Sequence, residues 1–105
     1  MGLKELGILI SRLTDPTVSI EYFNEWLTVK DFDTKAEAHL NMYENTVFYQ
    51  FNGNKSVSEE KLLWFLDIVN GIRRVIDVVT NKKTVNMVTE EELLKFAKKE
   101  TEGEE

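Results

Sequence analysis

The chain has no cysteine, one histidine and one proline among its 105 residues. The absence of cysteine excludes a disulfide framework, a thiolate zinc site and a cysteine nucleophile. A metal site would then need carboxylates at ligand spacing, and no calcium-loop pattern surrounds the nearest candidates, Asp31 and Asp33. We therefore expect neither a metal nor a cofactor, and interpret these two aspartates as turn residues.

Long apolar runs are also missing. Nothing approaches the roughly 18 consecutive apolar residues that a membrane span requires. The first 13 residues lack the small-residue cleavage site of a signal peptide. We expect no membrane partner and a cytoplasmic location, which the absence of cysteine also fits.

Basic residues are too few for a dedicated nucleic-acid binder. The chain has 13 Lys and Arg against 19 Asp and Glu, a formal net charge of −6, whereas binding to phosphates needs clustered cations. Its 42% hydrophobic content is that of an ordinary globular domain. We predict one domain over residues 1–100 and an acidic, flexible tail over 101–105.

The first segment has the pattern of a short amphipathic helix. Leu3, Leu6, Ile10 and Leu13 recur at spacings of three and four, with polar residues between them. Asp15-Pro16 should end this helix, because the residue before a proline is driven out of the helical region.

Residues 17–52 alternate between apolar and polar side chains, which favours β-strands. We place two-residue turns at Asn24-Glu25, Asp33-Thr34 and Glu44-Asn45. Counting outward from these turns puts twelve apolar side chains on one face of a four-stranded meander, although no turn contains the glycine that tight hairpins favour. The alternative is a helix over residues 16–28 with Asp15 as its N-cap. The twelve side chains are Val18, Ile20, Tyr22, Leu27, Val29, Ala36, Ala38, Leu40, Met42, Val47, Tyr49 and Phe51.

A long helix should follow a capping box formed by Ser56 and Glu59. Its apolar stripe runs through Leu62, Phe65, Val69, Ile72, Ile76 and Val79. The alternative ends the helix at the turn signal Asn70-Gly71 and makes 72–79 and 84–88 a strand pair. Under either interpretation 84–88 is a short strand, and Thr89 with Glu92 caps a last helix.

The sequence thus predicts an α+β domain. Its elements are an N-terminal helix, a four-stranded antiparallel β-meander, a long amphipathic helix packed on the sheet, a short strand and a C-terminal helix. We see no internal repeat and no second domain.

The second face of the predicted sheet carries the candidate partner-binding site. The same turn counting aligns Phe23, Trp26, Asn41 and Phe48 in one row across the strands. Such a row binds a partner when it stays exposed. Alternatively, the N-terminal or C-terminal helix covers it as a second small core.

The long helix has more apolar surface than one sheet can cover. Trp64, Ile68, Val75 and Val78 lie on a face that adjoins the main stripe, and we predict that they form the interface of a homodimer.

Arg73, Arg74, Lys82 and Lys83 form the basic cluster of the chain, where a phosphate contact is conceivable. The alternative pairs both arginines with Asp77 along the helix and leaves the lysines at its C-terminus, where cations favour the helix dipole.

These observations predict a non-enzymatic protein-interaction module, homodimeric, that regulates or inhibits a larger protein partner and that a cell, a virus or a plasmid could encode. A nucleic-acid or nucleotide binder, stacking bases on Phe23, Trp26 and Phe48, is the alternative. No phosphate-loop or nucleophile-elbow string occurs. An enzyme would require a pocket that brings carboxylates to His39.

Overall fold

A computed structural model of the chain describes residues 2–13, 15–51, 58–80 and 89–102. The fold is α+β, as the sequence predicted, while the predicted strand at 84–88 and residues 103–105 lie outside the described residues. In chain order the elements are α1 (Leu3–Ser11), β1 (Val18–Phe23), β2 (Trp26–Asp31), β3 (Ala36–Asn41), β4 (Thr46–Phe51), α2 (Glu59–Thr80) and α3 (Glu90–Glu102).

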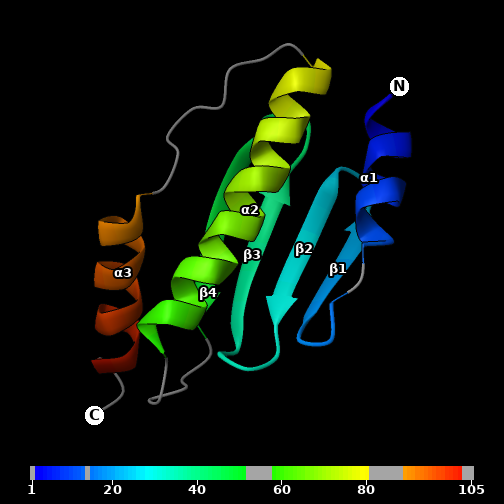
Figure 1. The fold of residues 1–105 in the computed structure, drawn as a ribbon. Coiled ribbons are helices and arrows are strands. Elements are labelled where there is room, and N and C mark those ends of the chain that lie inside the picture. Colours follow the sequence, from blue (N-terminus) through cyan, green and yellow to red (C-terminus); the bar gives the residue numbers. More distant parts are fainter. Residues whose placement is uncertain (1, 14, 52–57, 81–88, 103–105) are drawn as a thin grey trace.

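The four strands form one antiparallel sheet in the order β1-β2-β3-β4. All three helices lie on the same face of it, with α2 between α1 and α3 (Figure 1). We call this the covered face. Its side chains are the twelve that the alternation predicted, and each belongs to the hydrophobic core or packs against it. The rival helix over 16–28 is therefore wrong, because β1 and β2 occupy that stretch.

The predicted pairing of the first three strands is confirmed. Ile20 pairs with Val29 across β1 and β2, and Leu27 pairs with Leu40 across β2 and β3. Asn24 supplies the left-handed conformation of the first tight turn with a φ of 57°, which asparagine adopts more readily than most residues.

The predicted pairing of β3 with β4 is wrong by two residues. Leu40 pairs with Val47 rather than with Tyr49, and His39 rather than Asn41 lies opposite Phe48. The turn is a four-residue loop over 42–45, not a two-residue turn at Glu44-Asn45. Because side chains alternate with a period of two, a slip of two leaves every one on its predicted face.

An Asx side chain sets the length of this loop. The Oδ1 atom of Asn41 accepts hydrogen bonds from the backbone N–H groups of Tyr43 and Glu44, both at 3.0 Å. The loop over 32–35 is built alike, since Asp31 accepts from the N–H of Asp33 at 3.1 Å. These side chains provide the local bonds that a glycine turn would not need.

Helix α2 is continuous through Asn70-Gly71, so the alternative strand at 72–79 is wrong. A Cβ atom at Gly71 would have no neighbour within 4 Å. The apolar stripe on both sides of Gly71 packs on the sheet, and this burial outweighs the cost of about 1 kcal/mol for one helical glycine.

The helix starts are partly as predicted. The Oγ1 atom of Thr89 accepts from the N–H of Glu92 at 3.2 Å, which confirms the cap of α3. At α2 the Oγ atom of Ser58 accepts from the N–H of Lys61 at 3.4 Å, whereas the predicted cap Ser56 lies outside the described residues.

Tyr49 gives the core an alkaline pH dependence. Burial raises the pKa of its phenol to about 12, and the nearby charge of Arg73 opposes that rise. In the unfolded chain the phenol ionises near pH 10, so alkaline pH favours unfolding. We expect the wild type to lose about 1 kcal/mol of stability by pH 11 from this group.

The Tyr49→Phe variant should lack this loss, since it has no phenol to ionise. Urea unfolding of both proteins at pH 8 and pH 11 measures the difference. Parallel losses in the two proteins would show that Tyr49 ionises as readily in the folded state as in the unfolded one.

Candidate functional site

The second face of the sheet carries no helix among the described residues (Figure 1). We call it the open face. The alternative in which the N-terminal or C-terminal helix covers this face is wrong, because α1 and α3 pack on the covered face beside α2. Its side chains form three cross-strand rows. They are Phe23-Trp26-Asn41-Thr46, Glu21-Thr28-His39-Phe48 and Ser19-Lys30-Glu37-Gln50.

Four rings gather at one end of the open face, and we call them the aromatic cluster: Phe23, Trp26, His39 and Phe48. Phe23 pairs with Trp26 across β1 and β2. The ring centroids of Trp26 and Phe48 are 6.0 Å apart in an edge-on arrangement, and His39 stacks on Phe48 at 4.8 Å. Phe23 is 77% exposed and Phe48 54% exposed. These rings form a continuous, solvent-facing patch.

Asn41 belongs to the predicted row but not to the exposed patch. The residue is buried, and its side-chain oxygen is occupied by the turn. The two-residue slip also moves Phe48 from the Asn41 row to the His39 row. Phe48 still reaches Trp26 across β3, because both rings are large and stand on the same face of the sheet.

His39 joins the cluster through its stacking on Phe48, which the sequence did not reveal. Its Nδ1 atom lies 3.4 Å from the hydroxyl of Thr28, and its Nε2 atom lies 3.6 Å from the carboxylate of Glu37. Thr28 lies directly opposite His39 on β2, whereas Glu37 precedes His39 by two residues on β3. The described part of the chain gathers no group of three metal-ligating side chains.

Charges of both signs border the aromatic cluster. Glu21 is exposed two residues before Phe23 on β1, and the carboxylate of Glu37 lies 3.6 Å from His39. Lys30 is the only lysine or arginine among the described strand residues of the open face, and its ammonium lies 5.8 Å from the ring centre of Phe32. Carboxylates therefore outnumber cations around the patch.

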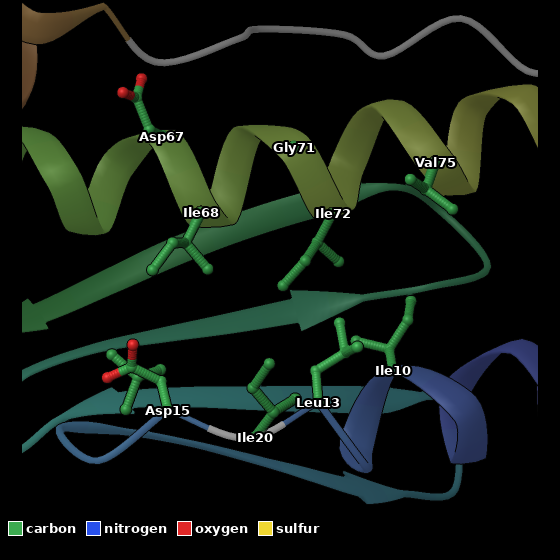
Figure 2. A pocket seen from close by; sticks show the side chains of 10 residues that line it. Ile10, Leu13, Asp15, Ile20, Asp67, Ile68, Gly71, Ile72 and Val75 are labelled. Atoms are coloured by element: carbon green, nitrogen blue, oxygen red, sulfur yellow. The ribbon is translucent and has the colours of Figure 1, made fainter.

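An apolar groove lies on the covered side, between α1 and α2 above β1 (Figure 2). This groove has a volume of about 340 Å³. Ile68 and Ile72 point down from α2 toward Ile10 and Leu13 (Figure 2). Asp67 also lines the groove from α2, with its carboxylate pointing away from Ile10 and Leu13 (Figure 2). The sequence did not predict this feature, because it depends on where α1 docks.

The four side chains predicted for a dimer interface lie along the side of α2 that carries Gly71, and we call this its outer side. Ile68 and Val75 line the groove. Val78 is 82% exposed, and Trp64 is partly buried beneath the ammonium of Lys61, 3.6 Å from the centre of its ring.

The predicted basic cluster is divided. Arg73 is fully buried, and its guanidinium donates to the backbone oxygen of Asn45 at 2.8 Å. The Asn45 side chain donates in return to the backbone oxygen of Arg73 at 3.2 Å. Burial lowers the pKa of Arg73, and no phosphate can reach its guanidinium. Arg74 is exposed, while Lys82 and Lys83 lie outside the described residues.

The fold and the site define a class of protein: an α+β domain with helices on one face of its sheet and aromatic rings on the other. Comparison with protein-family models, with curated proteins and with solved structures gave no match. Among the described residues, no helix is long and apolar enough to cross a bilayer.

Proposed function

We propose that this chain is a non-enzymatic protein-interaction module that binds a larger protein through the open face of its sheet. The observation that carries the proposal is the exposed aromatic cluster. Side chains such as Trp and Phe dominate the binding energy of protein interfaces, and a monomeric domain rarely leaves so many together in water.

The charges of the open face indicate the chemistry of the partner. Glu21 and Glu37 stand on the open face beside the aromatic rings, and the whole chain has a net charge of −6. The partner surface should therefore have an apolar centre with lysine or arginine at its rim, because complementary charges speed association and exclude wrong partners. Binding to such a surface would regulate or inhibit the partner in the cytoplasm.

The proposal is tested by measuring partner affinity with variants of the open face. The partner is first captured from an extract with the immobilised chain and identified, and its affinity is then measured by calorimetry. We expect Phe23→Ala and Trp26→Ala each to raise the dissociation constant at least tenfold, because both remove a large ring from the centre of the interface.

Leu9→Ala is the matched control, since Leu9 is 52% exposed on α1, on the other side of the molecule. It should leave the affinity unchanged. Circular dichroism checks that each variant folds, and Phe23→Ala is the safer of the two because Phe23 is the more exposed residue. Equal affinity of wild type, Phe23→Ala and Trp26→Ala would refute the proposal.

Binding of nucleic acid is the second candidate. It is supported by aromatic rings on an antiparallel sheet, a surface on which bases can stack. Nucleic-acid binding is opposed by the carboxylates of the open face, where Lys30 is the only lysine or arginine among the described strand residues. Fluorescence anisotropy with single-stranded oligonucleotides decides between the two: salt-sensitive binding that Trp26→Ala abolishes would favour nucleic acid over protein.

A further inference from the structure

The outer side of α2 is self-complementary about Gly71. Asp67 and Arg74 are both exposed and lie on the same flank of the helix, four residues before Gly71 and three after it. At 1.5 Å per residue they stand about 6 Å and about 4.5 Å from Gly71 along the axis. If a second α2 packs antiparallel with the two-fold axis at Gly71, each Asp67 lies opposite the Arg74 of the other copy.

The apolar residues of the same surface have the same symmetry. Ile68 and Val75 lie three residues before and four after Gly71, and Trp64 and Val78 lie seven before and seven after it. An antiparallel two-fold therefore places Ile68 against Val75 of the other copy, and Trp64 against Val78. Val78, which is 82% exposed in the protomer, would be covered in this arrangement.

Gly71 allows the two helices to approach at the axis. It lines the groove, and a Cβ atom there would meet nothing within 4 Å. Its lack of a side chain lets the backbones come close, so that the flanking isoleucine and valine side chains can interdigitate. The mid-helix glycine, which weakens the isolated helix, thereby gains a packing role.

We propose that two copies of this chain associate through α2 in an antiparallel, two-fold symmetric interface centred on Gly71. A two-fold interface joins one patch to itself, so every residue must find its complement on the same surface. The charges favour a second copy over another occupant. Neither Asp67 nor Arg74 forms an ion pair with another described residue. A surface that carries one charge of each sign can pair both charges with a second copy of the same surface.

The interface specifies the dimer in which the proposed module would act, and in that respect it rests on the proposed function. It lies on the helical side of the molecule (Figure 1), whereas the aromatic cluster lies on the open face of the sheet. Each dimer would thus present two open faces to partners.

The test is the mass of the full chain in solution, measured by light scattering and sedimentation over a range of concentrations. The wild type should reach twice its chain mass of 12.2 kDa. Gly71→Leu should raise the dimer dissociation constant at least tenfold, because the added side chain would occupy the space where the two α2 helices approach each other at the two-fold axis. It should still fold, since the space around Gly71 in the protomer is open.

Charge reversal tests the pairing itself. Asp67→Arg and Arg74→Asp should each weaken the dimer about tenfold, because like charges then face each other, and the double variant should recover most of the wild-type affinity. Arg12→Asp, which reverses an exposed arginine beyond the end of α1, should have little effect. A wild type that stays monomeric, or a double variant no better than the single ones, would overturn the inference.

The two proposals can fail separately. Loss of the dimer without loss of partner affinity per protomer, as expected for Asp67→Arg, leaves the open face as the binding surface. A Trp26→Ala variant that still dimerises but binds partner as tightly as the wild type refutes the proposed function and keeps the dimer.

Discussion

The Arg73→Met variant should unfold with a free energy about 3 kcal/mol lower than that of the wild type. Methionine fills much of the space of the arginine stem but has no guanidinium, so the hydrogen bond to the backbone oxygen of Asn45 is lost. This bond ties the β3–β4 loop to α2 across 28 residues of sequence. Because the bond is buried, water cannot replace the missing donor.

Denaturant unfolding followed by circular dichroism measures this loss. Arg74→Met is the matched control, since the neighbouring Arg74 is exposed and its replacement should change the stability by less than about 0.5 kcal/mol. Low protein concentration keeps self-association out of the comparison. If both variants lose equally little, the Arg73 guanidinium does not hold the loop.

Gly7→Ala should lower the stability by about 2 kcal/mol, although alanine favours helices over glycine. Gly7 is buried where α1 meets the sheet, and an added Cβ atom would overlap the ring of Tyr22 and lie 3.0 Å from the sulfur of Met42. The helix must then move away from β1, and the core side chains beneath it lose contact. Thermal unfolding measures the effect.

The control for this prediction is the other helical glycine. Gly71→Ala, made in open space and measured at the lowest protein concentration that gives a signal, should stabilise the protein by up to about 1 kcal/mol. Shortening the obstructing ring with Tyr22→Val should also rescue Gly7→Ala in part. A stabilising effect of Gly7→Ala would mean that α1 does not pack so closely on the sheet.

The face of each strand residue was predictable because it depends on local alternation. Leu27 and Leu40 point into the core, and Trp26 points out, whatever loop joins their strands, as long as each register error is an even number of residues. The β3–β4 slip shows the limit of such counting. A signal for it was present, since Asp31 and Asn41 each precede a four-residue loop, but recognising it required knowing which side chain would bond to the backbone.

The burial of Arg73 was missed. Its residue type alone led us to group it with Arg74 as a surface cation, because an arginine is seldom fully buried without a partner, although it lies four residues after Val69 and three before Ile76, both buried on α2. The partner is a backbone oxygen in the β3–β4 loop, and no pattern within α2 indicates that loop. The groove between α1 and α2 was hidden for the same reason, since its two walls are far apart in the sequence.

Hydrophobic periodicity alone determined that this chain forms four strands with one apolar face, and a long helix with apolar side chains to spare. These properties are local, because each residue's direction follows from its neighbours in the chain. Only the tertiary structure decided that all three helices pack on the same face and leave Phe23, Trp26 and Phe48 in solvent. This arrangement depends on contacts between segments that are distant in the sequence, because α1, α2 and α3 all pack on the one face of the sheet that is apolar.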